Sequence, residues 1–214
     1  MVARLADTLH MPLRERNALL VAAGYAPEYS ETSLDTPELA QVRRAIEFIL
    51  DHQEPYPAFV LDRRWEILMA NQAAVRVSGF LLGRPGHTNM IRQFFDPEDL
   101  RSVVMNWTEV AGGLIRHLHD EVAASPSDAK ARALLEEVLR YPGVPNDWRT
   151  RELGVEPPPL LTVEFRKNER SLRFFSTITT FGTPRDITLD ELRIECTFPS
   201  DVETADFCRE LGNR

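Results

Sequence analysis

The sequence predicts an α+β fold in which an antiparallel sheet of about five strands carries helices on one face. Apolar and polar residues alternate over short stretches before residue 71 and again after residue 160, which is typical of strands. Between these stretches, from about residue 89 to residue 153, apolar residues recur at the spacing of helices. The sheet is therefore expected to be assembled from both ends of the domain, with the helices in its middle.

Two short helical patterns open the chain, in the stretch LADTLHMPLRERNALLVAAGYAP at residues 5–27. Pro12 begins the second helix, and Gly24 stands where a left-handed cap would end it. Helices of about ten residues cannot bury an apolar face alone, so the unit formed by residues 1–27 needs a packing partner. The polar residues 28–37 are typical of a linker.

The main domain is expected over residues 38–200, and it begins with a helix that ends before two prolines. Strands are predicted at residues 58–61 and 65–70, with a tight turn between them. Asn71 follows the second strand and is well placed to cap the next helix.

Two adjacent glycines stand out in the helical middle of the chain. A helix is predicted from about residue 100 to residue 124, and Gly112 and Gly113 lie inside it. Each costs about 1 kcal/mol relative to alanine in a helix interior. Either another element packs closely against the glycines or kinks the helix there, or the glycines leave room for a ligand between helix and sheet. The sequence leaves both explanations open.

The last third of the main domain predicts three strands. LLTVEFRKN at residues 160–168 and SLRFFSTITTF at residues 171–181 form a plausible hairpin. In the third strand, residues 192–198, alternate positions are apolar and face one side: Leu192, Ile194, Cys196 and Phe198. Residues 201–214 are expected to be a C-terminal tail.

Charge and composition exclude several classes of function. The formal net charge is −8, from 25 basic and 33 acidic residues, so the chain as a whole repels a phosphate backbone. No run of apolar residues approaches the length of a membrane span, and the N-terminus lacks the layout of a secretory signal. These features predict a cytoplasmic protein without a membrane partner.

No pattern of catalytic or metal-binding residues emerges. Cys196 and Cys208 form no CxxC pair, and Cys196 is expected to be a small core residue. The five histidines lack the spacing of a metal site. Nucleophile elbows, phosphate-binding loops and dinucleotide fingerprints are missing from the sequence. We therefore predict no enzyme activity, no metal and no cofactor.

If the two glycines leave room for a ligand, an apolar pocket is expected between their helix and the sheet. Asn106 and Arg116, on the same helix, could donate hydrogen bonds to a bound carboxylate. For Arg116 a solvated surface position remains the simpler explanation. Large apolar residues on the facing elements would line the pocket: Phe59, Leu61, Trp107, Leu114, Phe174 and Ile178.

Three stretches of the sequence resemble the MmyB-like transcription regulators: residues 5–27, EPYPAFVLDRRWEILMANQAA at residues 54–74, and FGTPRDITLDELRIECTFPSD at residues 181–201. The resemblance implies that the main domain is PAS-like, binds a fatty-acid-like molecule and forms a homodimer. It also implies that residues 1–27 are the last helices of an Xre-type helix-turn-helix domain, whose first three helices are missing from this chain. Contact with DNA would then be made only by those missing helices.

Two other functions are weighed against a ligand sensor. A protein interaction or dimerisation module would cover the apolar face of the sheet with a partner and would leave no cavity. A small hydrolase would need a reactive nucleophile, which the sequence does not offer.

The resemblance predicts that this chain alone does not bind DNA sequence-specifically. Base edges are read by the second helix of a helix-turn-helix motif, which precedes the helices retained here. Residues 1–20 carry a net charge of 3 − 2 = +1, which offers few phosphate contacts. An anisotropy titration near physiological salt against the DNA upstream of the gene should show no competitor-resistant binding. Tight, specific binding would make residues 1–27 a working DNA reader.

Overall fold

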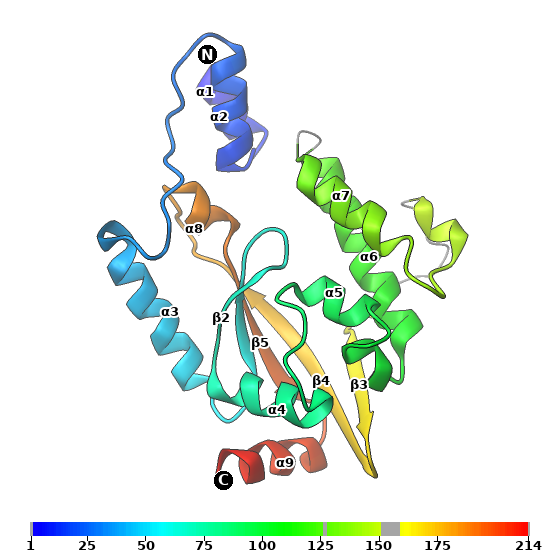
Figure 1. Cartoon of the computed structure of the whole chain (residues 1–214). Coiled ribbons are helices and arrows are strands. Elements are labelled where there is room, and N and C mark those ends of the chain that lie inside the picture. The colour runs from blue at the N-terminus through cyan, green and yellow to red at the C-terminus, as the bar shows by residue number, and fades with distance from the viewer. Residues whose placement is uncertain (1, 126–127, 151–158, 214) are drawn as a thin grey trace.

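The computed structural model describes residues 2–125, 128–150 and 159–213, and it contains one five-stranded sheet (Figure 1). All neighbouring strands run antiparallel, in the order β2-β1-β5-β4-β3. The predicted α+β fold, PAS-like and built from both ends of the domain, is confirmed. The strands are β1 (Ala58–Leu61), β2 (Ile67–Ala70), β3 (Thr162–Lys167), β4 (Arg170–Thr179) and β5 (Arg193–Pro199).

Helices surround the sheet and continue beyond it at both ends of the chain. Two short helices lead the chain and one closes it: α1 (Val2–Thr8), α2 (Leu13–Ala22) and α9 (Val202–Gly212). The remaining α-helices are α3 (Ala40–His52), α4 (Gln72–Leu82), α5 (Met90–Phe95), α6 (Trp107–Ala124), α7 (Ala129–Val138) and α8 (Ile187–Glu191). Short 3₁₀ helices are η1 (Pro37–Leu39), η2 (Leu100–Val103) and η3 (Asn146–Arg149).

Both faces of the sheet are covered by helices. The face expected to carry helices packs against α4, α5 and α6, with Leu61, Phe165 and Phe174 buried on it. The opposite face is covered by α3, a helix that the sequence predicted without assigning it to a face. Ala58, Val60, Ile194 and Cys196 form a core there with Ile46 and Leu50 of α3. Cys196 is thus the small core residue that was expected.

Asn71 caps the start of α4, as the sequence predicted. Its Oδ1 accepts hydrogen bonds from the backbone N–H groups of Ala74, which caps α4, and of Ala58 at the start of β1. Its Nδ2 donates to the carbonyls of Tyr56 and Leu50. One buried amide therefore joins α3, β1 and α4.

The long helix predicted from residue 100 is interrupted. Residues 100–103 form η2, and α6 begins only at Trp107. Between them the backbone N–H of Met105 donates to the carbonyl of Glu164 on β3 at 2.7 Å. The interruption lets this segment pair with the edge of the sheet, which a continuous helix could not do.

The C-terminal end of the chain differs from its predicted role, whereas the two predicted N-terminal helices are present. Residues 201–214, expected as a tail, include α9, whose Phe207 and Cys208 are buried against α4 and β4. The opening helices contact α8 through the start of α2. Much of their apolar surface is nevertheless exposed, including Leu9 at 61% and Val21 at 57%.

Candidate ligand-binding site

A cavity lies between the sheet and helices α4 and α5. Its volume is about 80 Å³. The sheet contributes residues of β1, β3, β4 and β5, and the helical layer contributes residues of α4, α5 and η2. The lining residues are Pro57, Phe59, Ala74, Val77, Ser78, Leu81, Met90, Gln93, Phe94, Leu100, Val163, Phe165, Phe174, Ser176, Glu195 and Thr197.

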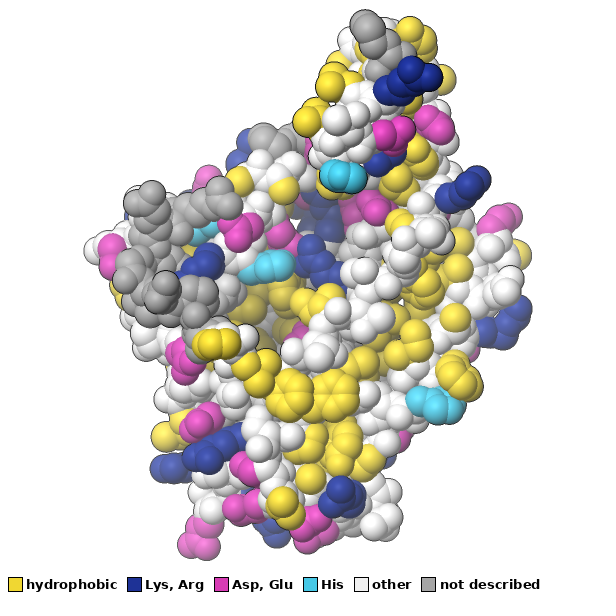
Figure 2. Space-filling model, turned by 180° about the vertical axis from the view of Figure 1, so that it is seen from behind, with side chains coloured by type: hydrophobic (Ala, Val, Ile, Leu, Met, Phe, Trp, Pro, Cys, Tyr) yellow, Lys and Arg dark blue, Asp and Glu magenta, His cyan; other side chains and the backbone are white. Residues whose placement is uncertain are grey.

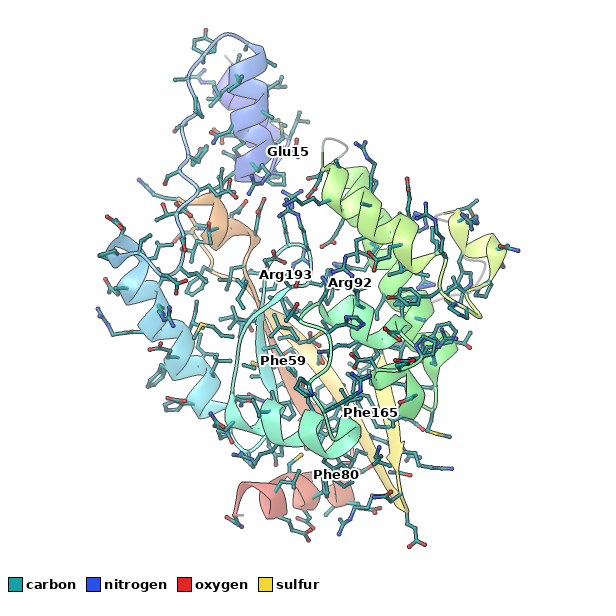
Figure 3. The ribbon with its side chains drawn as sticks, in the orientation of Figure 1. Glu15, Phe59, Phe80, Arg92, Phe165 and Arg193 are labelled. Carbon is teal, nitrogen blue, oxygen red and sulfur yellow. The ribbon has the colours of Figure 1, made fainter. Side chains whose placement is uncertain are left out.

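Aromatic rings from both layers form the apolar wall of the cavity. Phe165 lies 6.3 Å from Phe174 and 6.3 Å from Phe94, measured between ring centroids. Phe59 lies across the sheet from them on β1, and Figure 3 labels it together with Phe165. Strand alternation turns these rings inward, because their sequence neighbours face the other side of the sheet.

Polar side chains gather at one side of the cavity, on the two strands β4 and β5. Ser176 and Thr197 are directly opposite each other in the β4–β5 register. Glu195 is paired with Phe59 of β1 on its other side. Because Ile194 and Cys196 face α3, Glu195 and Thr197 must face the cavity.

Glu195 is the functional candidate that sequence reasoning did not single out. Its Oε2 is buried and has no hydrogen-bond partner among the described residues. Burial raises the pKa of this carboxyl group above its usual range, although a hydrogen bond with Ser176 opposes the rise. The sequence did place Glu195 on the face opposite Ile194. Only the packing of α4 and α5 in the structure shows that this face is covered.

Two of the eight predicted site residues, Phe59 and Phe174, line the cavity. Leu61 and Leu114 pack into the core beside it. Ile178 lies directly across from Glu195 in the register of β4 and β5, but it is 46% exposed.

The remaining three predicted residues lie on or next to α6, outside the lining of the cavity. Trp107 donates its Nε1–H to the carbonyl of Phe94 at 2.7 Å. Asn106 binds the backbone of β3: its Nδ2 donates to the carbonyl of Thr162, and its Oδ1 accepts the N–H of Glu164. Arg116 is partly buried on α6. Trp107 and Asn106 hold the start of α6 to its neighbours, and none of the three residues lines this cavity.

Close packing explains Gly113 of α6, whereas Gly112 has room for a methyl group. A Cβ on Gly112 would lie 3.5 Å from the ring of Trp148, and a Cβ on Gly113 would lie 3.2 Å from Leu161. The cavity is bordered instead by α4 and α5. The expectation that the glycines make room for a ligand is therefore wrong for this cavity.

Alanine at position 112 tests whether the space beside Gly112 is free to take a methyl group and whether α6 belongs to the binding site. Its methyl group would make ordinary van der Waals contact with Trp148, and the helix would lose the backbone entropy cost of glycine. We expect Gly112→Ala to raise the free energy of unfolding by about 0.5–1 kcal/mol, measured by urea denaturation. Ligand affinity should not change. If Gly112→Ala weakened ligand binding without lowering stability, α6 would have to be part of the binding site.

A larger, polar hollow lies between the N-terminal helices and the main domain, where residues of α6, α7, α8 and β5 border it. Its volume is about 920 Å³. Residues of both charges line it, and Figure 2 shows basic and acidic side chains side by side below the N-terminal helices. The lining includes Arg16, Arg63, Arg193, Glu28, Glu121, Asp190 and Glu191.

A network of charges beside this hollow joins α2 to the main domain. The backbone N–H of Leu13 donates to Asp190 at 2.9 Å, and Arg14 binds Glu191 at 2.7 Å. Glu191 is also bound by Arg63 of the β1–β2 turn, at 2.6 Å. Arg63 in turn pairs with Asp128, the cap residue of α7. The start of α2 is therefore connected to α8, the sheet and α7.

The capping role of Asp128 predicts sensitivity to acid. Burial would raise the pKa of Asp128, but the hydrogen bond from the backbone N–H of Ala131 and the charges of Arg63 and Arg64 lower it overall. Since the folded-state pKa lies below the unfolded value of about 3.9, this contribution is present above about pH 4. It is lost as the pH falls through the folded-state pKa.

We expect Asp128→Asn to lower the free energy of unfolding near neutral pH by about 1–3 kcal/mol. Because the titrating carboxylate is gone, the variant should also lose less stability than the wild type on acidification. Urea denaturation from neutral pH to about pH 3 measures both effects. Asp147→Asn, at an exposed position, is the control. Equal pH dependence in wild type and Asp128→Asn would contradict the role of this carboxylate.

Residues 2–125, 128–150 and 159–213 bring together no group of three or more His, Cys, Asp or Glu that could hold a metal ion. Within the same ranges, none of the helices has both the length and the apolar character that crossing a bilayer requires.

Comparison with known proteins agrees with the resemblance seen in the three sequence stretches. The family model of the MmyB-like transcription regulator ligand binding domain matches residues 42–211, which is more than half of the chain. The match runs from α3 to α9 and includes the whole sheet and the cavity. A search of curated proteins found no significant match. The chain therefore belongs to the MmyB-like transcription regulator family, and residues 42–211 form its ligand-binding domain.

Proposed function

We propose that the domain senses a fatty-acid-like amphiphile, a molecule with a hydrocarbon chain and one oxygen-bearing end, in the cavity between the sheet and helices α4 and α5. One observation carries the proposal: the cavity has an aromatic wall, and Ser176, Glu195 and Thr197 gather on two neighbouring strands, while α4 and α5 add the uncharged Ser78 and Gln93. Such a division fits a ligand that is apolar along its length and polar at one point. Phe59 and Phe174 are the predicted site residues that we retain as ligand contacts.

The size of the cavity bears on how such a ligand enters. A volume of about 80 Å³ is smaller than the roughly 150 Å³ of an engineered cavity that accepts benzene. Only a few carbon atoms fit without movement, so a longer chain requires the walls to separate. We propose that α5 and η2 move, because they are short elements of six and four residues, whereas the sheet is held by hydrogen bonds along each pair of strands.

The strand β5 offers a route from the cavity to the N-terminal helices. Glu195 faces the cavity, and Arg193, two residues earlier, pairs with Glu121 of α6. Immediately before β5 lies α8, where Asp190 and Glu191 hold the start of α2. We propose that ligand contact with Glu195 shifts the side chains of Arg193 and Glu121 and so changes this contact with α2, while the strand itself stays in place.

The proposal extends to the setting in which the domain works. α1 and α2 would be the last helices of a helix-turn-helix domain, so the movement of α2 would reach the part that contacts DNA. A transcription regulator acts in the cytoplasm of a bacterium, and a homodimer would suit the two-fold operators that helix-turn-helix dimers bind. Light scattering of the purified protein tests the dimer.

The direct test of the proposed function is to identify what the protein binds. Native mass spectrometry of the purified protein, followed by lipid extraction, should reveal an amphiphile that co-purifies. Calorimetric titration with eight-carbon probes should show binding. In thermal unfolding experiments, the bound probe should raise the unfolding temperature of the protein. If no lipid co-purifies and no probe binds, an interaction module becomes the better description of the domain.

A substitution that fills the cavity should abolish this binding. Ser78 lies on α4 and lines the cavity, so leucine at this position would occupy the space of the ligand. We expect Ser78→Leu to weaken probe binding at least about tenfold, equivalent to about 1.4 kcal/mol, while stability changes by less than about 1.5 kcal/mol. Gln72→Leu, on the same helix but exposed, is the matched control. Unchanged affinity in Ser78→Leu would place the ligand elsewhere.

A further inference from the structure

Glu195 is the one ionisable side chain among the described residues that line the cavity. Its carboxyl group lies beside aromatic and aliphatic groups, and Oε2 has no hydrogen-bond partner in the described part of the chain. A buried polar atom without a partner costs free energy, so it is unusual unless it serves a purpose. A ligand atom that completes the hydrogen bond is one such purpose.

The sheet presents no charge that could neutralise Glu195. Its cross-strand neighbours are Phe59 on β1 and Ile178 on β4. Arg193 lies on the same face of β5, two residues away, but it binds Glu121 of α6.

Among the described residues of α4, α5 and η2 that line the cavity, none is a cation that could pair with Glu195. The polar residues that α4 and α5 contribute to the cavity are Ser78 and Gln93, which are uncharged. On α6, His117 contacts Glu121 at 3.3 Å and lies 3.5 Å from Arg193. In the described residues, Arg193 and His117 are therefore both engaged with Glu121, and Glu195 has a hydrogen bond with Ser176 but no ion pair.

An apolar site without a cation favours the uncharged form of a carboxyl group. This form has an O–H group that can donate one hydrogen bond. The raised pKa of Glu195 agrees with this environment.

We propose that Glu195 keeps its proton and recognises the polar end of the ligand by donating a hydrogen bond to an uncharged hydroxyl or carbonyl oxygen. This inference rests on the proposed function and names the head group of the same ligand. The ligand class is thereby narrowed to neutral amphiphiles such as fatty alcohols, aldehydes, esters and amides. A carboxylate would bring a charge into a cavity with no cation to balance it.

Three probes with the same chain and different heads test this inference: octanol, octanoate and octylamine. Calorimetric titration of the whole 214-residue chain near neutral pH should show that octanol binds at least about tenfold more tightly than either charged probe. Tighter binding of octylamine would show an ionised Glu195 and overturn the inference. Equal binding of octanol and octanoate would overturn it too.

Two variants of Glu195 test whether octanol binding depends on a hydrogen-bond donor at this position or only on the shape of the side chain. Glu195→Gln keeps a neutral donor, so its affinity for octanol should stay within about threefold of the wild type. Glu195→Leu removes the donor and should weaken octanol binding at least about tenfold. Glu164→Gln, on the outer face of β3 where it pairs with Arg173, is the matched control and should change nothing. A loss of octanol binding in Glu195→Gln, with the control unchanged, would overturn the inference.

A further measurement needs no variant. Infrared spectra of the wild type near neutral pH should show the band of a protonated carboxyl group, and octanol should shift it. Absence of the band would overturn the inference. If all three probes bind equally, the inference fails while the proposed function stands. If none binds and the band does not respond, both fail.

Discussion

The central position of β5 in the sheet is the constraint on which the rest of this structure depends. β5 is the last strand in the sequence, yet it lies between β1 and β4, so it joins the strand pair from the start of the domain to the hairpin from its end. α8 leads into it and α9 follows it. Ile194 and Cys196 fill the core under α3, and the alternate residues face the helical layer. Displacing β5 would separate the two halves of the sheet.

A strand covered on both faces normally reads as a continuous apolar run, but β5 carries charged residues on one face. Each of them therefore needs a partner inside the protein. Arg193 has the carboxylate of Glu121 and lies over the ring of Trp65, 5.6 Å from its centroid. Glu195 faces a cavity, and its Oε2 is left without a partner in the described residues. An unsatisfied buried group costs about 1–3 kcal/mol, so this position is hard to explain by stability alone.

Local signals in the sequence predicted the five strands and the helix after Asn71 but missed α8 and α9, and the arrangement of the elements depended on contacts between distant segments. Alternating residues located the strands, and Asn71 marked the start of α4 because capping is a local interaction. The gap between η2 and α6 could not be read in this way, since it results from pairing of Met105 with β3 some sixty residues later. For the same reason the glycines of α6 suggested a pocket, although they accommodate Trp148 and Leu161.

In the candidate site, too, some residues could be predicted from the local sequence and one could not. Phe59 and Phe174 were predicted because large apolar residues on inward-facing strand positions must pack against something. Glu195 was not, because in a single strand a charged residue at an alternate position is the ordinary mark of a solvent-exposed face. Only the packing of α3 on one face and of α4 and α5 on the other shows that both faces of β5 are covered. A carboxylate that a central strand directs toward an apolar cavity, as β5 does at Glu195, is therefore a reason to test for a bound ligand there.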